Sequence, residues 1–473
     1  MVILNLLVKP IAIFGIDATV QNRVGAEAYG TYFSLLNFSF LFNILLDVGI
    51  NNFTTKSVAQ YPKAAVNYLG KVITFRFILF LIYAVFTVSI ALILGWTDEE
   101  LYLLVFLVFN QLFITLIAYA RSHFGGLLMF KSDALISVLD RFLLILFCGA
   151  VLFLPITDQP FKIEWFVWIQ TGCYALACII AISMLIRKIG VPQIKPKRLF
   201  SYAIVRKSLP YALLILLMMI YTRTDSVMIE RMHPDGKNQS GYYAQGFRLL
   251  DAFFMFAMLF SNLLFPMFSR MLAKKESITS LMQTGSKLLL GGAILIASVV
   301  CFNSYYILHW IYTSNLLESE SIFILLMFAF IAMCTTLLFG TVLTANGNLK
   351  FLNITAGVGI LVNISLNAIL IPLYGAQGAA IATVSTQSAV ALVQVGYTTW
   401  LFNWKINWTA LGQLIGFAAF SFVIQYFLSV WNIWVFIGLI CVQIGALFLF
   451  QLVNLKALKE VALSGGSEEN SEQ

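Results

Sequence analysis

The chain has 473 residues, of which 60% are hydrophobic and only 11% are charged, whereas an ordinary soluble domain is about 25% charged. About 20 apolar residues make one membrane-spanning helix, so roughly fourteen helices with short loops use up the sequence and leave no soluble catalytic domain of about 100 residues. A water-soluble enzyme, a secreted disulfide scaffold and a nucleic-acid-binding protein are therefore excluded, the last in spite of a net charge of +8, because in a membrane protein the placement of basic residues matters more than their sum.

The sequence predicts an all-α polytopic membrane protein of about fourteen transmembrane helices. Apolar runs bounded by charged or Gly/Pro/Asn-rich breaks mark the helices. The first run has neither a basic n-region nor a small-residue cleavage site, so we interpret it as a retained helix and not as a signal peptide. In chain order the predicted helices are 2–22, 31–52, 72–96, 101–120, 134–155, 165–186, 208–229, 242–268, 288–312, 321–344, 351–371, 376–401, 408–430 and 433–453.

The positions of Lys and Arg predict the orientation of these helices. If the N-terminus is cytoplasmic, every inner connection carries at least one basic residue, while the outer connection before the fourth helix carries Asp98, Glu99 and Glu100. We therefore expect both termini in the cytoplasm. The most basic connection, 187–207, carries seven Lys and Arg and lies near the middle of the chain, where a linker between two lobes is expected.

An internal repeat supports two lobes. Asp17 is followed after 12 residues by Gly30-Thr31-Tyr32 and a long aromatic helix, and Asp225 is followed after 15 residues by Gly241-Tyr242-Tyr243 and another such helix. Each copy has an Asp near the outer end of an odd-numbered helix, then a polar hairpin and a Gly-x-Tyr entry. Phe- and Leu-rich helices also resemble one another by composition alone, and this alternative stays open. Internal repeats are typical of secondary transporters, whose substrate site lies between the halves.

Charged side chains inside the predicted helices are the candidates for function. Each costs on the order of 2.5–3.5 kcal/mol at the membrane centre, so it is expected to face a partner or an aqueous cavity. They concentrate on the first, second, fifth, seventh and eighth helices, a pattern that indicates a polar cavity lined by a few helices. The set is Lys9, Asp17, Asp47, Asp140, Arg141, Arg223, Asp225, Arg248 and Asp251.

Spacing along the helices separates these residues into pairs. Arg223 and Asp225 are two positions apart and point in different directions, so at least one of them needs a partner on another helix or a ligand. Arg248 and Asp251 lie three positions apart on one helical face, where they can neutralise each other. For this second pair a structural and a functional role both stay open.

Lys9 stands directly before Pro10, which breaks the helical hydrogen-bond ladder inside the predicted first span. A charge beside such a break is a sharper functional signal than a charge near a helix end. Asp140 and Arg141 lie about two turns inside the fifth helix, from where they can reach the inner interface by snorkelling. Asp17 lies close to the outer end of its helix and can likewise be an interface residue.

Motifs for enzymes and cofactors are missing from the sequence. It contains no Walker A loop, no HExxH and no GxSxG. The six cysteines lie in apolar runs without a CxxC pair, and the three histidines are scattered, so no metal site is expected. We expect no cofactor and no enzymatic activity. Transport would then be driven by an ion gradient, a membrane potential or the substrate gradient.

Two stretches carry recognisable patterns. Residues 23–50, RVGAEAYGTYFSLLNFSFLFNILLDVGI, contain R-x-G-x-x-x-Y-G-x-Y followed by L-D-x-G. Residues 341–387, TVLTANGNLKFLNITAGVGILVNISLNAILIPLYGAQGAAIATVSTQ, contain N-x-x-L-N-x-x-L-I-P-x-x-G-x-x-G-A-A-x-A-T. Both resemble bacterial polysaccharide (O-antigen type) flippases of the multidrug/oligosaccharidyl-lipid/polysaccharide exporter superfamily. The shared residues are turn glycines, Pro372 and Asn367, so they specify the fold better than the substrate.

The resemblance implies a particular domain organisation. Two six-helix lobes, 1–186 and 208–401, would surround a central cavity and be joined by the basic cytoplasmic linker 187–207. Two extra helices would follow at 402–455. The polar and acidic tail 456–473 is predicted to be cytoplasmic and disordered.

The resemblance also implies a function. An undecaprenyl-diphosphate-linked oligosaccharide would be flipped from the cytoplasmic to the periplasmic leaflet of the bacterial inner membrane, for O-antigen, capsule or exopolysaccharide synthesis. The implied partners are this lipid-linked substrate, membrane lipids and polysaccharide polymerase machinery, with no nucleic acid. Cationic cavity residues suit a diphosphate, and the candidates are Arg23, Arg223, Arg248 and Lys9. Three acids depart from a purely cationic cavity and are candidates for ion coupling: Asp17, Asp225 and Asp251.

Two other classes of protein stay open. A cation-coupled multidrug exporter of the same superfamily would use buried carboxylates for proton or sodium exchange, which Asp17 and Asp225 allow. A membrane enzyme such as a polysaccharide polymerase is disfavoured, because the predicted outer loops are too short for a periplasmic catalytic segment.

Overall fold

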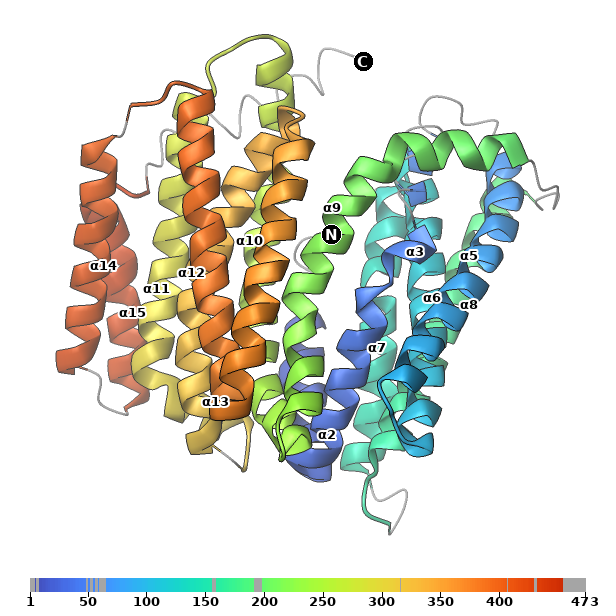
Figure 1. Ribbon diagram of the computed structural model, residues 1–473. Helices are drawn as coiled ribbons and strands as arrows, with labels where there is room; N and C mark the ends of the chain where they lie inside the picture. The colour runs from blue at the N-terminus through green and yellow to red at the C-terminus, as the bar shows by residue number, and fades with distance from the viewer. Residues whose placement is uncertain are drawn as a thin grey trace. The chain divides into compact units, whose positions relative to one another are not determined.

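The computed structural model describes residues 5, 8–47, 50–51, 54–55, 58, 65–154, 159–190, 198–314, 316–405, 407–428 and 432–453. Every regular element in these ranges is a helix, so the predicted all-α fold is confirmed (Figure 1). The elements are η1 (Ile11–Asp17), α2 (Ala18–Leu41), α3 (Ile44–Asp47), α5 (Ala65–Ile93), α6 (Asp98–Gly126), α7 (Phe130–Phe153), α8 (Ile163–Ile189), α9 (Arg198–Met232), α10 (Gly236–Ala273), α11 (Thr279–Ile311), α12 (Leu316–Ala345), α13 (Leu349–Leu401), α14 (Trp408–Leu428) and α15 (Ile433–Leu449).

The helices follow the predicted order, and most extend beyond the apolar runs. The helix α9 begins ten residues before the predicted start at residue 208, and α10 begins at Gly236, before the predicted 242. Hydropathy marks only the part of a helix that crosses hydrocarbon, whereas the backbone ladder continues into polar ends outside it. The basic segment 187–207 is therefore partly helical, at its start in α8 and from Arg198 onward in α9. The predicted tail 456–473 lies outside the described residues.

Two of the turns between helices are made by glycines with positive φ. Gly25 (φ 85°) ends the first helix inside α2, and Gly375 (φ 55°) divides α13. Side chains are disfavoured at such φ values, which glycine adopts freely. Beyond Gly375, the backbone N–H of Ala376 donates to Gln239 Oε1 at 2.9 Å, so the backbone group freed by the turn is satisfied. The predicted break at Pro372–Gly375 is confirmed.

The second predicted helix, 31–52, is not continuous, and that part of the prediction is wrong. The helical ladder stops at the end of α2 and resumes in α3. At the interruption, Asn43 donates to the side chain of Gln111 in α6, and the hydroxyl of Tyr83 in α5 donates to the carbonyl of Ser39 at 2.7 Å. An interrupted helix at membrane depth needs such partners, because lipid offers none.

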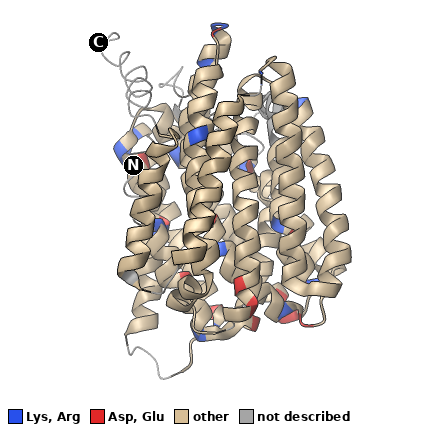
Figure 2. Cartoon of the chain, turned by 90° about the vertical axis from the view of Figure 1, so that its left-hand side faces the viewer, with Lys and Arg blue, Asp and Glu red and all other residues tan. Residues whose placement is uncertain are grey.

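The described helices have the length and surface of membrane spans. Among them, nine are long and apolar enough to cross a membrane, namely α5 to α8 and α10 to α14. Large apolar side chains such as Ile93 and Leu392, which are 82% and 72% exposed, are expected on a face that contacts lipid. Figure 2 shows long uncharged stretches between charged residues that lie mostly near helix ends. The protein is an integral membrane protein.

The chain divides into two compact units. Unit 1 comprises 1–245, 311–315 and 356–379, and unit 2 comprises 246–310, 316–355 and 380–473. In unit 1 α8 packs against α6 and α7, and α2 packs against α6 and α9. The eight helical elements from η1 to α9 therefore share one core, in which Tyr29 and Tyr32 are fully buried. The lobe boundaries proposed from the repeat stay a prediction.

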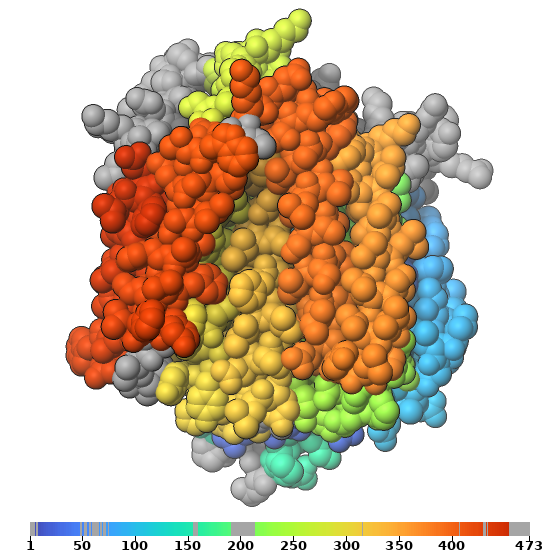
Figure 3. Space-filling model, turned by 60° about the vertical axis from the view of Figure 1, so that its left-hand side comes forward, coloured from blue at the N-terminus to red at the C-terminus, as the bar shows by residue number. Residues whose placement is uncertain are grey.

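Unit 2 has a core of its own. Leu264 and Phe268 of α10 pack with Met282 of α11 and Leu338 of α12 in one buried cluster. A second cluster joins α11 to the two C-terminal helices through the buried rings and methyl groups of Ile294, Phe417, Ala446 and Leu452. Figure 3 shows the outer surface of this unit, with α14 and α15 in red.

Candidate functional site

The first helix changes its hydrogen-bonding pattern inside the predicted first span. Pro10 has no backbone N–H and precedes the π-helical turn η1, and the α-helical pattern resumes at Ala18. Single π-helical turns are frequent at functional sites. Asp17 ends this turn with its side chain 4% exposed, and its Oδ1 has no hydrogen-bond partner in the described part of the chain. The predicted break is therefore present, and it leads to a buried carboxylate.

The first helix runs parallel to α7 in a defined register. Asn5 Nδ2 donates to Ser137 Oγ at 3.0 Å. Twelve residues further along α7, a side chain on Gly149 would meet Ile16 Cδ1 at 3.6 Å. Residues of the first helix therefore lie beside residues of α7 whose numbers are larger by about 132.

This register brings Lys9 beside Arg141, so two positive charges lie on neighbouring helices. Arg141 Nε pairs with Asp140 at 3.5 Å, and its guanidinium lies 5.9 Å from the ring centroid of Tyr174. Lys9 lies within electrostatic reach of both Arg141 and Asp140. Because α7 already begins at Phe130, the pair is about 15 Å from the inner end of its helix. Asp140 and Arg141 therefore lie further from the inner end of the helix than the predicted helix start at residue 134 implied.

Arg223 of α9 contacts α2. Its Nη1 donates to Asn37 Oδ1 at 3.3 Å, and its guanidinium lies 5.8 Å from the ring centroid of Phe40. The side chain is half-buried. Asn37 itself is held by a bond from its Nδ2 to the carbonyl of Phe33 at 3.0 Å, so the arginine contacts a fixed amide. The expectation that at least one of Arg223 and Asp225 has a partner on another helix is confirmed.

Asp225, two positions later, contacts different partners. It is 1% exposed, and its two oxygens accept hydrogen bonds from Tyr243 Oη at 3.0 Å and from Asn367 Nδ2 at 2.7 Å. Asn367 Nδ2 also donates to Asn363 Oδ1 at 3.1 Å, while Asn367 Oδ1 has no partner among the described atoms. Two carboxylate and two amide oxygens therefore belong to one buried hydrogen-bonded cluster, in which the amide nitrogen of Asn367 donates to both Asp225 and Asn363.

Arg248 and Asp251 lie in unit 2, on the part of α10 that follows residue 245. Both side chains are half-buried, one helical turn apart. Arg23, Lys9, Arg223, Asp17 and Asp225 all belong to unit 1. The structure brings these five into one unit and leaves the other two in the second.

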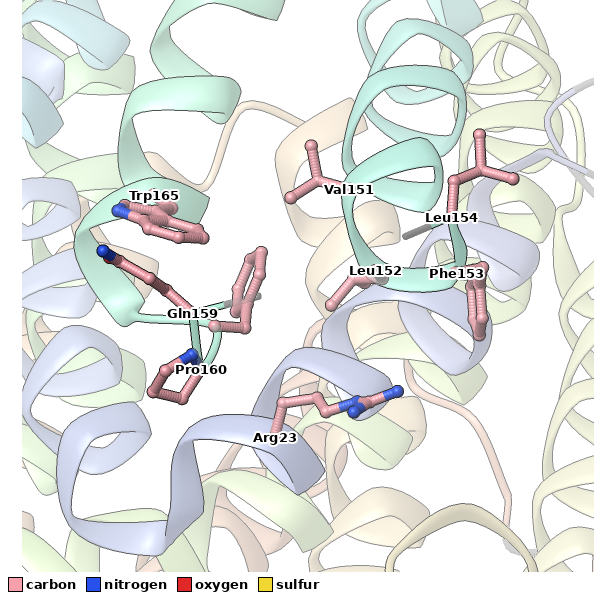
Figure 4. A pocket seen from close by; sticks show the side chains of 9 residues that line it. Arg23, Val151, Leu152, Phe153, Leu154, Gln159, Pro160 and Trp165 are labelled. Atoms are coloured by element: carbon pink, nitrogen blue, oxygen red, sulfur yellow. The ribbon is translucent and has the colours of Figure 1, made fainter. Parts of the chain in front are cut away.

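Arg23 lines a pocket at the predicted outer end of unit 1 (Figure 4). The cavity of about 320 Å³ is bounded by the last residues of α7, by Gln159 and its neighbours before α8, and by Trp165 in the first turn of α8. Arg23 is exposed and lies fourteen residues after Lys9 on the first helix, a distance of about 21 Å at 1.5 Å per residue. These two predicted site residues therefore cannot bind the same phosphate group.

Arg76 is a buried cation that the sequence analysis did not single out. It lies in α5 with its side chain 2% exposed, and it donates to Asp47 Oδ1 and Asn51 Oδ1, both at 2.7 Å. Its guanidinium also covers the ring of Tyr119 at 4.7 Å. Because Arg76 stands only one turn inside the predicted helix 72–96, hydropathy alone gives no sign of its burial. Asp47 is therefore an ion-pair partner inside unit 1.

Clusters typical of metalloenzymes are not present in the described residues, where no three His, Cys, Asp or Glu side chains come together. The polar groups that do meet are guanidinium groups, amides and single buried carboxylates on the first helix, α2, α7, α9 and α13. This arrangement can bind an anionic or sugar-rich group and can exchange a cation.

Comparisons with known proteins identify the family and the fold. Residues 2–272 match the family model described as "Polysaccharide biosynthesis protein". No curated protein matched the chain. Among solved structures, "Lipid II flippase MurJ, inward closed conformation" is similar, with a TM-score of 0.71 and 17% identity over 95% of this chain and 97% of that one.

Two transporters of the MOP superfamily are similar as well. The inward-facing conformation of a multidrug resistance MATE family transporter has a TM-score of 0.65 and 15% identity over 84% of this chain and 94% of that chain. A MOP superfamily transporter from Pyrococcus furiosus has a TM-score of 0.55 and 13% identity over 85% and 95%. At these identities the likeness concerns the fold.

Proposed function

Because the chain belongs to the polysaccharide biosynthesis protein family and has the fold of MOP superfamily transporters, we propose that it flips an undecaprenyl-diphosphate-linked oligosaccharide across the bacterial cytoplasmic membrane. The cargo would leave the cytoplasmic leaflet and reach the periplasmic leaflet, where polysaccharide polymerase machinery would use it for O-antigen, capsule or exopolysaccharide synthesis. Both termini would be cytoplasmic. This is a transport function, without a catalytic step.

The observation that carries the proposal is the placement of Arg223. A charge within a spanning helix is costly unless it serves a partner or a ligand. Arg223 donates to the amide oxygen of Asn37 and is half-buried, so part of its surface is accessible. A planar guanidinium binds phosphate oxygens with two parallel hydrogen bonds. Amides such as Asn37 beside it suit the hydroxyl groups of a sugar.

Further cations would bind the diphosphate at other depths. Lys9, beside Arg141 in the register described above, adds a second positive charge within the span. Arg23, in its pocket at the predicted outer end, would contact the cargo late in the cycle. Arg248, in unit 2, is the fourth candidate cation. In this proposal the phosphates pass from one cation to the next, and no single arginine holds them throughout.

The buried acids would couple transport to an ion. Asp225 lies with Asn363 and Asn367 in an oxygen-rich place, and Asp17 has an oxygen without a partner among the described atoms. Either arrangement can exchange a proton or a metal cation as the surroundings open to one side. Asp251 is the third candidate.

The alternative function is a cation-coupled multidrug exporter of the same superfamily. It is favoured by the same buried acids, because a carboxylate can bind a cationic drug or its counter-ion. The two functions differ in what accumulates when the gene is removed. If the protein is a flippase, the deletion strain accumulates lipid-linked glycan on the cytoplasmic side. If it is a multidrug exporter, the deletion strain becomes sensitive to toxic compounds.

The test uses a deletion strain complemented with single variants. We expect Arg223→Ala to abolish surface polysaccharide and to accumulate lipid-linked glycan at normal protein levels, and Arg223→Lys to restore only part, since Lys lacks the bidentate fork. The matched control is Arg270→Ala, an exposed arginine in the last turn of α10. Full surface polysaccharide in the Arg223→Ala strain would remove this residue from the site.

A further inference from the structure

The cavity beside Arg23 brings together side chains from three segments of unit 1. Arg23 directly follows the predicted first span, Leu152 belongs to the last turn of α7, and Trp165 belongs to the first turn of α8. In Figure 4, Gln159 and Trp165 lie on one side of the cavity, the end of α7 lies on the other, and Arg23 lies between them. The fold, and not one continuous stretch of sequence, therefore builds this cavity.

Arg23 carries the only charge among the nine described residues that line the cavity. Its side chain is exposed, and its guanidinium makes no hydrogen bond or ion pair with the described part of the chain. A guanidinium presents a planar fork of donors, which can bind a carboxylate through two parallel hydrogen bonds. The cavity therefore offers one unpaired positive charge to an anionic group of a ligand.

The walls beside this charge are apolar and aromatic. The ring centroids of Phe161 and Trp165 are 6.0 Å apart and the ring planes meet at 80°, so the two half-buried rings form a corner. The face of an aromatic ring carries partial negative charge, which suits the C–H groups on the flat side of a sugar ring. The exposed amide of Gln159 can both donate to and accept from hydroxyl groups. Apolar walls with a few converging polar groups are typical of small-molecule sites.

The volume and depth of the cavity narrow the class of ligand. Its volume of about 320 Å³ is at the lower end of the range of about 300–1,000 Å³ for small-molecule pockets, so it suits one sugar ring and not a whole oligosaccharide. Gln159 lies between the predicted spans 134–155 and 165–186, beyond the hydrocarbon layer, where the glycan of a lipid-linked cargo is found. One carboxylate balances the single guanidinium of Arg23, whereas a diphosphate carries more charge than Arg23 alone can neutralise.

We propose that this cavity binds one acidic sugar of the cargo, a hexuronic acid or another sugar that carries a carboxylate. The carboxylate pairs with Arg23, the sugar ring lies in the corner between Phe161 and Trp165, and its hydroxyl groups bond to Gln159. The inference rests on the proposed function and deepens it, because it names one component of the oligosaccharide. The glycan precedes the diphosphate out of the membrane, so Arg23 meets the acidic sugar first.

The test measures the binding of soluble glucuronate to the purified full-length protein by isothermal titration calorimetry, with glucose, glycerol 1-phosphate and inorganic phosphate as comparison probes. Glucuronate is expected to bind at least tenfold more tightly than glucose, because charge-assisted hydrogen bonds are about twice as strong as neutral ones. Arg23→Met is expected to remove this preference, and Trp165→Leu is expected to weaken glucuronate binding at least tenfold. The matched controls Lys162→Met and Trp434→Leu are expected to bind like the wild type, because both side chains are exposed and neither lines the cavity.

Three results would overturn the proposal. They are the absence of glucuronate binding, equal affinities for glucuronate and glucose, and tighter binding of either phosphate probe. The third result would assign the cavity to phosphate groups such as those of lipid headgroups.

A second measurement analyses the sugars of the surface polysaccharide that the deletion strain loses. This polymer is expected to contain an acidic sugar, and a polymer without one would also contradict the proposal. If the deletion strain keeps its surface polysaccharide, the proposed function fails, while glucuronate binding by the purified protein is still measured. The two failures are therefore distinct.

Discussion

Replacing Arg76 by Met is expected to destabilise the protein by about 3–5 kcal/mol. The guanidinium binds the side chains of Asp47 and Asn51 at 2.7 Å and the carbonyls of Leu46 and Thr115 at 3.3 Å. Met keeps most of the apolar stem and removes the charge. The substitution therefore tests the ion pair and its hydrogen bonds while the packing of the stem is retained.

The magnitude follows from the geometry of the pair. Two unit charges 2.7 Å apart attract each other by about 6 kcal/mol at an effective dielectric constant of about 20. The cost of taking both charges out of water offsets much of that attraction, so the intact pair adds little stability. Removing only Arg76 leaves the carboxylate of Asp47, 22% exposed, without its counter-charge, and this is the expensive state.

An SDS titration of the purified protein, followed by circular dichroism, measures the free energy of unfolding. The double variant Arg76→Met/Asp47→Leu is expected to lose less stability than Arg76→Met alone, because no charge stays unpaired. Arg270→Met, at an exposed position, serves as control and is expected to change stability by less than about 0.5 kcal/mol. A loss below about 1 kcal/mol for Arg76→Met, set against the range expected for a broken buried pair, would refute this account of the cluster.

Three further predictions concern orientation, a turn and coupling. A cysteine at Glu99 is expected to react with an impermeant reagent added outside intact cells and a cysteine at Lys275 is not, and the reverse result would invert the orientation. Gly378→Ala is expected to cost about 1–3 kcal/mol, because the added carbon would lie 2.3 Å from a backbone oxygen; the same change at Gly357, which has open space, should cost nothing in the same SDS titration. Asp17→Asn is expected to remove the response of transport in vesicles to an imposed pH gradient, since its buried carboxylate can no longer exchange a proton; a response equal to that of the wild type would assign Asp17 a structural role.

The sequence was sufficient for the order of the helices and for some of the site. Apolar runs marked each span, because hydrocarbon demands them whatever the tertiary packing. The two-residue spacing of Arg223 and Asp225 correctly required partners on other helices, and these are Asn37 and Asn367. The spacing could not identify those partners. They are 186 and 142 positions away in the sequence, and both are uncharged side chains, which hydropathy does not single out.

Other features depend on packing that one sequence does not show. The repeat was visible in Gly30 and Gly241, yet nothing in it indicated that the two copies touch each other. The interruption of the second helix was missed because a single Asn43 in a mostly apolar run does not mark a break. Arg76 was missed because burial of a cation is decided by Asp47 and Asn51, which reach it from a different helix.

Irregular backbone and charge occur on the same elements of unit 1. The π-helical turn η1 ends at Asp17, the interruption after α2 lies one to two turns beyond Asn37, and Asn37 binds Arg223. In a membrane, interrupted helices and charges have separate costs, and each is tolerated only inside protein or beside a water-filled cavity. Two independent costs that fall on the first helix, α2 and α9 have one common explanation. In the proposed function, the cargo would pass along these helices.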